Sequence, residues 1–551
     1  MTIQQHVAKV SSTPTSASVT EIDLERLAWP LLPDSALATL REVGEECDVD
    51  TGHVLFEVGQ PSYDLVVVLK GSVHIVDRAG DQIVVTISAP NFVGELGMIL
   101  GQSTFLACVA AEPSRVLIVP QAAVIRFVAT IPEISDILVT ALAARRRLLI
   151  EWGQGGLTII GREDDPKALQ LLEFASRSRI PHRFIHRSDQ EAIAALSSGQ
   201  ALPATGTLAI TGRSEVLIDP TPRQVAVALG LDLQVDQATT FDMVVIGAGP
   251  AGLAAAVYGA SEGLSTLVIE DTAIGGQAGT SSRIENYLGF STGISGSELA
   301  FQGQIQAFKF GAKITAPRRA QTLRSIDDLY EIELDDGSCA RTKTVVLANG
   351  VRYRRLPIPR LEDFEGAGVY YAATELEARF CSNTSAVILG GGNSAGQAAM
   401  FLSRRAHCTH IVVRGQGLAA TMSSYLSDRI ETDSRIRLWT HTEVGSLFGD
   451  DRLEALTLVN KLTGEEERIE TRALFIMIGA APNTGWLGDT IDLDEKGFVI
   501  TGQQGDPFAT SLPGVYAVGD VRAGSVKRVA SAVGEGSVVV SSVHQYLAAR
   551  E

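Results

Sequence analysis

Two glycine-rich loops, each directly after a short apolar run, constrain this chain of 551 residues more than any other feature. The first lies in FDMVVIGAGPAGLAAAVYGASEGLSTLVIED, where a strand predicted over 243–246 leads into Gly247, Gly249 and Gly252. Glycines at this spacing provide a tight turn, a close approach of the backbone to a pyrophosphate, and tight packing of the next helix on its strand. The amides and the dipole at the start of that helix then face the phosphates. The loop therefore predicts a dinucleotide site.

An acidic residue closes the same segment. Glu270 lies 23 residues after Gly247, near the spacing of about 20 expected for the acid that binds a ribose hydroxyl. With strand, helix and acid all in place, we interpret the loop as a cofactor site rather than an ordinary turn. Its predicted contacts, which we assign to FAD, are Gly247, Gly249, Pro250, Ala251, Gly252 and Glu270.

The second loop lies in SAVILGGGNSAGQAAMFLSRRAHCTHIVVRG, after a strand predicted over 387–389. The strand that follows ends in Arg414 instead of an acid. An acid would bind the free 2′-hydroxyl of NAD, whereas an arginine can pair with the 2′-phosphate of NADP. We therefore expect NADPH, and NADH stays open because an arginine at a strand end can equally be solvated. The predicted contacts are Gly390, Gly392, Asn393, Ser394, Ala395, Arg414 and Gly479.

A third segment, LPGVYAVGDV, lies near the end of the chain. A strand predicted over 515–518 leads through Gly519 to Asp520, whose carboxylate can hydrogen-bond the ribityl or phosphate part of FAD. A pyridine nucleotide delivers hydride, and a flavin accepts it and passes electrons on singly or in pairs. Two dinucleotide sites in one chain therefore predict an FAD-dependent oxidoreductase in which hydride passes from NADPH to FAD.

The region 241–551 resembles the low-molecular-weight thioredoxin reductase family of flavoproteins. GAGPAG, GGQ, ENY, ANG, GGGNSA, FIMIGAAPNT and GDV occur in the order typical of that family. The resemblance implies a homodimer, an NADP-binding domain inserted into the FAD-binding domain, and roles for Gln277, Asn286 and Asp520 against the flavin. The further FAD contacts that it implies are Gly276, Gly350, Gly519 and Val529. At the flavin edge the chain departs from the family, with Lys527 and Arg528 in place of the usual Arg-Gln pair, and we expect a cation there to stabilise anionic reduced flavin.

The chain departs from this family at the redox-active dithiol. The family has a CATC motif, and the corresponding run VYYAATELEARFC has Ala372 and Glu375 in place of the two cysteines. No residue is therefore assigned a certain catalytic role, and we interpret Cys381 as a packed core thiol. Without an intrinsic CxxC, a thioredoxin-disulfide reductase-like enzyme needs another acceptor: an iron–sulfur protein, a quinone, oxygen, or a partner with its own disulfide. The alternative is a redox or nucleotide sensor with vestigial catalysis.

Short β-rich runs over 21–153 predict a β jelly roll. The run NFVGELGMILGQSTFLACVAAEPSRVLIVP resembles the phosphate cassette of cyclic-nucleotide-binding domains, with matches at Gly94, Glu95, Leu96 and Gly97. In that family the glutamate binds the ribose 2′-hydroxyl and an arginine binds the cyclic phosphate, but this chain has Thr104 in the arginine's place. A cyclic nucleotide, a different nucleotide, a protein partner and a purely structural barrel stay open. We expect the barrel to regulate the flavoprotein part.

The expected fold class is multidomain. The jelly roll is followed by a small α/β unit that resembles a thioredoxin-like domain without cysteines, and then by two α/β Rossmann-like dinucleotide-binding domains. The predicted limits are 1–20 for a disordered tail, 21–153 for the barrel, 154–236 for the thioredoxin-like unit, 241–355 with 479–551 for the FAD-binding domain, and 356–478 for the inserted NAD(P)H-binding domain.

Composition excludes some classes of function. The net charge of −18 and the pI near 5.0 provide no basic footprint for DNA. The five cysteines include no two separated by two residues, which argues against a disulfide framework or a metal site and favours a reducing compartment. No apolar run reaches the roughly 18 residues of a membrane span. We therefore expect a cytoplasmic protein without a membrane span.

Overall fold

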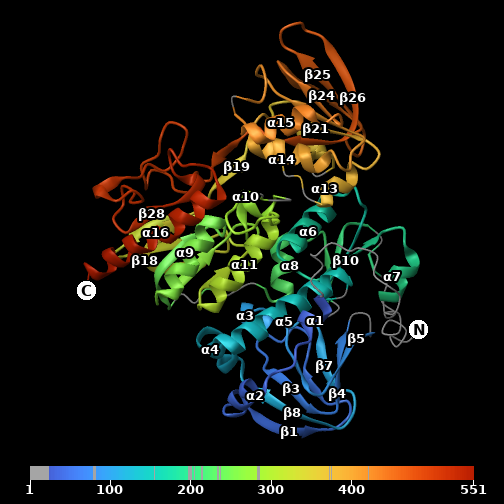
Figure 1. Cartoon of the computed structure of the whole chain (residues 1–551), viewed down its shortest axis with the longest axis vertical. Coiled ribbons are helices and arrows are strands. Elements are labelled where there is room, and N and C mark those ends of the chain that lie inside the picture. The colour runs from blue at the N-terminus through green and yellow to red at the C-terminus, as the bar shows by residue number, and fades with distance from the viewer. Residues whose placement is uncertain are drawn as a thin grey trace.

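The computed structural model of the chain describes residues 24–78, 82–153, 155–196, 202–203, 205–212, 215–231, 235, 238–281, 284, 286–365, 367–371, 373, 375–419 and 421–550. The predicted tail 1–20 and Ala372 lie outside these residues. Figure 1 shows four units: a blue one at the bottom, a teal one above it, a green-to-red one at the left and an orange one at the top. The predicted multidomain fold class is confirmed, while the domain limits stay a prediction.

The first unit is an antiparallel β barrel of two four-stranded sheets. Valine and isoleucine dominate its strands, as residues that favour extended chain. One sheet has the order β1 (Glu45–Val49), β8 (Ser114–Val119), β3 (Leu65–Lys70), β6 (Asn91–Val93), and the other β2 (Val54–Phe56), β7 (Ala107–Ala110), β4 (Ser72–Asp77), β5 (Gln82–Ser88). Its helices are α1 (Leu24–Ala28), α2 (Asp34–Arg41), α3 (Gly97–Leu100), α4 (Gln121–Thr130) and α5 (Pro132–Glu151).

The second unit is the small α/β unit predicted from the sequence. Its strands β9 and β10 are parallel, and β11 and β12 continue the sheet antiparallel. The order is β10 (His182–His186), β9 (Leu157–Gly161), β11 (Leu208–Thr211), β12 (Val216–Ile218), with helices α6 (Pro166–Arg177), α7 (Gln190–Leu196) and α8 (Pro222–Ala228). The apolar positions of α6 and α8 pack with the tip of α5 in one cluster, which joins this unit to the barrel.

The third unit contains the first glycine loop. Its sheet has the order β15 (Lys313–Thr315), β14 (Thr266–Ile269), β13 (Thr240–Ile246), β18 (Cys339–Leu347), β17 (Leu329–Leu334), β16 (Ala320–Ile326), and β28 (Val515–Ala517) pairs with β18. Its helices are α9 (Pro250–Ser261), α10 (Gly276–Gly279), α11 (Gly296–Lys309) and α16 (Val529–Ala548). The short helix η3 (Gly519–Val521) follows β28.

The fourth unit repeats this strand order around the second glycine loop. The order is β23 (Ile436–Trp439), β22 (Cys408–Val412), β21 (Ser385–Leu389), β26 (Glu466–Ile476), β25 (Ala455–Asn460), β24 (Thr442–Phe448), and β20 (Val369–Tyr370) pairs with β26. Its helices are α12 (Leu361–Phe364), α13 (Glu375–Phe380), α14 (Asn393–Leu402) and α15 (Ser424–Thr432). In both units the central parallel strand leads into the glycine loop and its helix.

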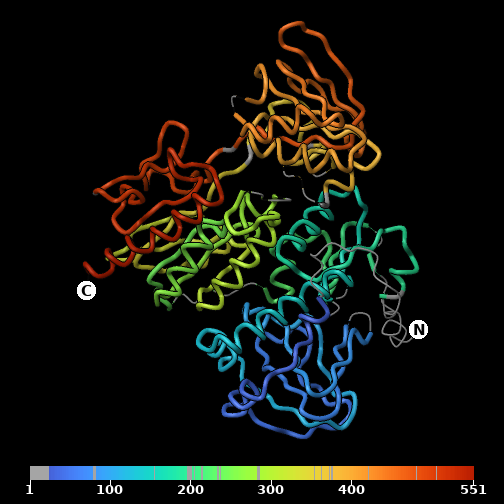
Figure 2. Tube along the Cα trace, viewed as in Figure 1, coloured from blue at the N-terminus to red at the C-terminus, as the bar shows by residue number. Residues whose placement is uncertain are grey.

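Two adjacent strands connect the third and fourth units. β19 (Val351–Tyr353) leaves the third unit, and β27 (Ala480–Pro482) returns to it as the antiparallel partner of β19. Figure 2 shows the chain crossing between the two units there. The Asn349 and Asn483 side chains each donate from Nδ2 to the other's backbone oxygen, so the connection is fixed on the side of the third unit.

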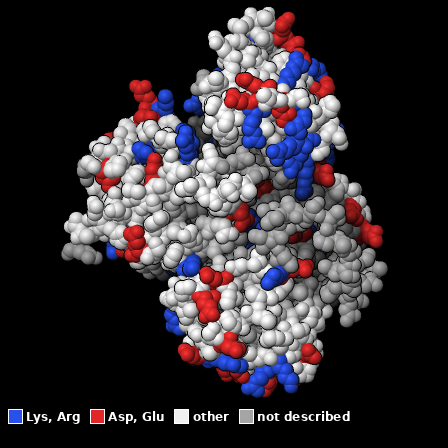
Figure 3. Space-filling view, viewed as in Figure 1, with Lys and Arg blue, Asp and Glu red and all other residues white. Residues whose placement is uncertain are grey.

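The barrel also contacts the third unit directly. Phe301 and Ile305 of α11 belong to the same apolar cluster as the barrel core. Within the described ranges, no single helix is long and apolar enough to cross a membrane. Helices α4 and α5 together have the length and composition of a span, but they are bent by 116° where they meet. In Figure 3 the basic side chains of this face gather mainly over the upper, fourth unit, while both signs of charge mix elsewhere.

Candidate functional site

The first glycine loop forms a cradle with the GGQ turn. Gly247 has φ of 104°, and a Cβ there would lie 2.4 Å from the Ala348 oxygen, so only glycine is tolerated. Gly276 has φ of 53°, and its Cβ would lie 2.9 Å from the Gly249 Cα. The two loops therefore approach backbone to backbone. Helix α9 begins directly after Gly249 without a side-chain cap, so its first amides are available to an anion.

Glu270 fixes this loop from the end of β14. Its Oε2 accepts a hydrogen bond from the Ala248 amide at 2.7 Å, and its Oε1 accepts one from the Thr272 amide at 3.0 Å. Burial raises the pKa of the Glu270 carboxyl, and the two amides oppose that rise. A buried acid next to the loop is what the ribose-binding role requires.

Gln277 presents a buried acceptor without a partner. Its Nε2 donates to the Val351 oxygen at 3.0 Å, while its Oε1 has no hydrogen-bond partner. The Asn349 Oδ1 is buried and unpartnered in the same way. Buried polar atoms normally find partners, so a ligand with N–H or O–H donors fits these two oxygens. The cradle and the unpartnered acceptors together fit FAD.

The GD segment closes the cradle through a residue that sequence reasoning missed. The Gly519 amide donates to Glu535 Oε2 at 2.7 Å, and Arg522 forms an ion pair of 2.7 Å with the same carboxylate. Burial raises the pKa of Asp520, and the Lys527 charge opposes the rise. Glu535 lies in α16 and fixes the turn that presents Asp520. The signal available for it was that Glu535 is the only Asp, Glu, Lys or Arg in α16.

The other predicted flavin contacts divide into two groups. Helix α16 packs so closely on α9 that a Cβ at Gly536 would lie 2.1 Å from the Ala251 oxygen, which places Pro250, Ala251 and Gly252 beside the Asp520 turn. Gly350 has φ of 59° between Asn349 and the Val351 acceptor. The remaining four are less enclosed: Asn286, Lys527 and Arg528 are exposed, and Val529 begins α16.

The second loop repeats the geometry of the first. Gly390 has φ of 145°, and a Cβ there would lie 2.2 Å from the Met477 oxygen. Helix α14 begins after Gly392 without a side-chain cap. Asn393 is used internally, because its Oδ1 accepts from the Ser423 amide at 2.8 Å. Ala395 is buried, Ser394 is exposed, and Gly479 has φ of 94° at the end of the neighbouring chain.

Two residues near this loop were missed by the sequence analysis. Thr421 donates from Oγ1 to the Gly391 oxygen at 2.7 Å, and the Ser423 Oγ is buried without a partner. Arg414 is exposed after β22, and among the described residues it has no ion-pair partner. An unpartnered hydroxyl and an unpaired cation at an uncapped helix start fit a phosphorylated nucleotide.

The region that replaces the dithiol is only partly described. Ala372 lies outside the described residues, and Glu375 begins α13. Cys381 is fully buried, which confirms the prediction of a core thiol, and burial raises its pKa to about 12. A thiol of this kind is not a thiolate at neutral pH. In the described parts of the chain, no group of three or more His, Cys, Asp or Glu could hold a metal ion.

The cassette residues of the barrel are engaged with other parts of the chain. The Glu95 Oε1 accepts from Arg146 of α5, and its Oε2 accepts from the Gly97 amide at 2.7 Å. Thr104 is buried, and its Oγ1 donates to the Glu57 oxygen at 2.5 Å. Gly94 and Leu96 are buried beside them. The structure thus brings all four predicted residues to one end of the barrel. The Glu95 carboxylate and the Thr104 hydroxyl, however, already form hydrogen bonds within the protein.

The fold and the glycine loops define a two-dinucleotide oxidoreductase, and comparison with known proteins agrees. Residues 241–536, more than half of the chain, match the family model of the pyridine nucleotide-disulphide oxidoreductases, so the chain belongs to that enzyme family. Within it the chain is thioredoxin reductase-like: it is 34% identical to thioredoxin reductase of Treponema pallidum over 309 residues, which cover 56% of this chain and 98% of the relative. Residues 46–130 match the cyclic nucleotide-binding domain. Both predicted resemblances are confirmed.

Solved structures lead to the same family. The thioredoxin reductase of Lactococcus lactis in its FR conformation is 29% identical, with a TM-score of 0.53, over 56% of this chain and 99% of that one. The thioredoxin reductase of T. acidophilum is 30% identical, with a TM-score of 0.52, over 57% and 99%. The likeness therefore covers the two dinucleotide-binding units as a pair.

Proposed function

We propose that the chain oxidises NADPH with FAD and delivers the electrons to an acceptor that is a separate molecule. The observation that carries this proposal is the Gly249–Gly276 cradle with the unpartnered Gln277 Oε1 beside it. When bound, FAD accepts hydride from a reduced nicotinamide and releases electrons singly or in pairs. The chain's own residues hold and orient both cofactors and exclude water.

The residues divide by cofactor. The amides that begin α9 would bind the FAD pyrophosphate, Glu270 a ribose hydroxyl, and Gln277 and Asp520 the flavin and ribityl end. Gly390, Gly392 and the start of α14 would bind the pyridine nucleotide pyrophosphate, with Arg414 on the 2′-phosphate. This set leaves NADPH preferred over NADH, because Arg414 supplies a charge that only the phosphate uses.

The acceptor has to be external. The sequence has no two cysteines separated by two residues, and the positions of the family dithiol are Ala372 and Glu375. A disulfide relay needs a sulfur pair, so no relay of that kind is available here. An iron–sulfur protein, a quinone, oxygen and a partner carrying its own disulfide are the candidates.

We further propose a homodimer in the cytoplasm, regulated by the barrel. Two routes lead to the flavin-binding unit, one from the small α/β unit to the cradle and one from the barrel through the small α/β unit to α11. Arg177 of α6 donates from Nη2 to the Gly276 oxygen at 3.4 Å. Arg146 of α5 donates to the Arg179 oxygen at 3.1 Å, and Arg179 pairs with Glu298 of α11 at 3.0 Å.

The test uses the purified full chain. We expect a flavin spectrum that NADPH bleaches anaerobically at enzyme-like rates, faster than NADH does. Gly276→Ala should be colourless, because its φ of 53° and the Cβ contact of 2.9 Å with Gly249 leave no room. Gly303→Ala on α11 is the matched control, since its Cβ meets Leu253 at an ordinary 3.5 Å. Colourless wild type that FAD cannot reconstitute contradicts the proposal, and sluggish bleaching favours the sensor.

A further inference from the structure

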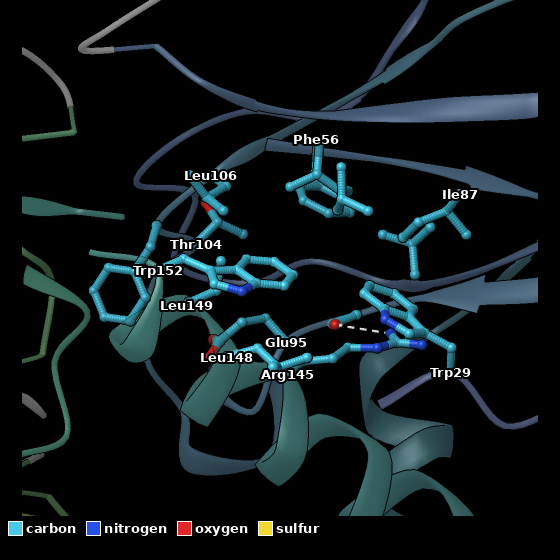
Figure 4. Close-up of a pocket in the computed structure, with 15 residues that line it drawn as sticks. Trp29, Phe56, Ile87, Glu95, Thr104, Leu106, Arg145, Leu148, Leu149 and Trp152 are labelled. Carbon is cyan, nitrogen blue, oxygen red and sulfur yellow. Dashed lines mark hydrogen bonds between the residues drawn. The ribbon is translucent and has the colours of Figure 1, made fainter. Parts of the chain in front are cut away.

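The barrel contains an apolar cavity at the end where the cassette lies. It has a volume of about 60 Å³, well above the ~10–15 Å³ that one water needs. Figure 4 shows Phe56, Ile87 and Leu106 on one side, and Leu148, Leu149 and Trp152 near α5 on the other. Trp152 is 41% exposed, so this end of the cavity meets solvent. A cavity with such walls favours an apolar ligand.

One cation lines this cavity. Arg145 of α5 is only 5% exposed, and no carboxylate of the described residues pairs with it. Its Nε donates to the Ala28 oxygen at 2.8 Å and its Nη1 to the Gly94 oxygen at 3.2 Å, while its Nη2 is buried without a partner. The rings of Trp29 and Phe92 lie 4.4 and 4.3 Å from the guanidinium. A buried charge without a counter-ion is costly, so an anion in the cavity would satisfy both the charge and the free N–H.

The cassette does not offer a cyclic nucleotide its usual partners. Glu95, which lines the same cavity, is already paired with Arg146 and with the Gly97 amide. Thr104 carries no charge, and its hydroxyl bonds the Glu57 oxygen. Among the described residues of the cavity wall, Arg145 is thus the one charged side chain without an ion-pair partner, and the other walls are apolar or have their polar groups engaged.

We propose that this cavity binds a compact apolar carboxylate, aromatic or short and aliphatic, with the carboxylate on Arg145 and the apolar body between the barrel strands and α5. The arginine supplies one unused N–H and the positive charge. Loss of a charged hydrogen bond of this kind lowers affinity about tenfold to a hundredfold. This proposal concerns the barrel alone and goes beyond the proposed redox function.

Binding is measured on the full chain with benzoate and octanoate, with benzamide and cyclic AMP as comparison ligands. The readouts are tryptophan fluorescence, since Trp29 and Trp152 line the cavity, and the rise in melting temperature that any ligand of the native state causes. We expect at least one carboxylate to bind at least tenfold more tightly than benzamide, and cyclic AMP to have no effect. Neither carboxylate binding, equal binding of benzoate and benzamide, or preferred binding of cyclic AMP would overturn the proposal.

Variants locate the site. Arg145→Gln should weaken carboxylate binding at least tenfold. Arg147→Gln is the matched control, because Arg147 lies on the same helix, is exposed and, among the described residues, pairs only with Glu151, at 3.4 Å. If circular dichroism shows that Arg145→Gln does not fold, Val85→Phe tests the site instead. This substitution fills the cavity and leaves Arg145 in place, so it should abolish carboxylate binding. Retained carboxylate binding in Val85→Phe, or equal loss in Arg147→Gln, contradicts the assignment. Neither measurement involves NADPH, so a failure here leaves the proposed redox function untouched.

Discussion

Glu95 of the cassette loop accepts a hydrogen bond from the Arg146 guanidinium, 51 residues later on α5. Arg146 is 1% exposed and the Glu95 side chain 15%. The carboxylate that cyclic-nucleotide-binding domains use for a ribose is thus a partner of a buried arginine here. The pair connects the cassette to α5, the helix that precedes the small α/β unit.

Glu95→Gln should destabilise the barrel by about 3 kcal/mol, because it leaves the Arg146 charge buried without a counter-ion. Calorimetry of the full chain measures the loss in the barrel's own transition. Glu57→Gln is the control. The Glu57 side chain is 50% exposed and that of its ion-pair partner Arg78 is 36% exposed, and such a surface pair contributes at most about 1 kcal/mol. Equal losses in the two variants would show that the Glu95–Arg146 pair has no special weight.

Arg414→Gln should raise the apparent Kd for NADPH about tenfold to a hundredfold, since the 2′-phosphate loses a charged hydrogen bond. The apparent Kd for NADH should stay unchanged. Anaerobic flavin bleaching at varied nucleotide concentration measures both constants. Arg404→Gln is the control, because Arg404 is exposed beyond the opposite end of α14. A parallel loss for NADH would contradict the role of Arg414.

Arg177→Gln should raise the dissociation constant of FAD about fivefold. The Arg177 Nη2 donates to the oxygens of Ala273 and Gly276, both at 3.4 Å, and one hydrogen bond of modest geometry contributes about 1 kcal/mol. Flavin release on dilution measures the affinity. Lys167→Gln, at the other end of α6, tests whether any lost charge on this helix has the same effect. If FAD release is unchanged in Arg177→Gln, the contact between Arg177 and Gly276 does not link the small α/β unit to FAD binding.

The fourth unit should lose stability in acid through His410. Burial, aided by the Arg437 charge, lowers the pKa of His410 to about 4, and the Trp439 indole donates to its Nδ1 at 3.0 Å. Because the folded pKa lies below the unfolded value near 6.5, the unfolded state binds the proton first. The contribution of neutral His410 to the free energy of unfolding is therefore complete above about pH 6.5. It falls by up to about 3 kcal/mol as the pH approaches 4.

His410→Gln should remove this part of the slope. The measurement is the melting temperature of the fourth unit from about pH 7 to about pH 5, as the difference between variant and wild type. His407→Gln, an exposed histidine of the same unit, should keep the slope. Identical pH curves for His410→Gln and wild type would contradict the prediction.

The local parts of the site were predictable from the sequence. Strand, glycine loop and helix are consecutive in the chain, so Gly247 and Gly390 and their helices follow from spacing alone. The short-range pairing of β13 with β14 likewise places Glu270 at the loop.

Contacts between distant segments were not predictable. Gly276 contacts Gly249, and Glu535 accepts a hydrogen bond from the Gly519 amide. Arg146 forms an ion pair with Glu95. Each contact exists only because tertiary packing brings the two segments together. The three consecutive arginines of α5 gave the only hint, since charged residues inside an apolar helix need partners. Which of them would be buried depends on how α5 lies on the barrel.

The most direct test of the account is an anaerobic titration of the purified protein with NADPH, followed by the flavin absorbance. Because the sequence has no CxxC motif to take a second electron pair, we predict complete bleaching at one equivalent of NADPH per FAD. An endpoint at two equivalents would reveal a second two-electron centre and contradict the claim that the acceptor is a separate molecule.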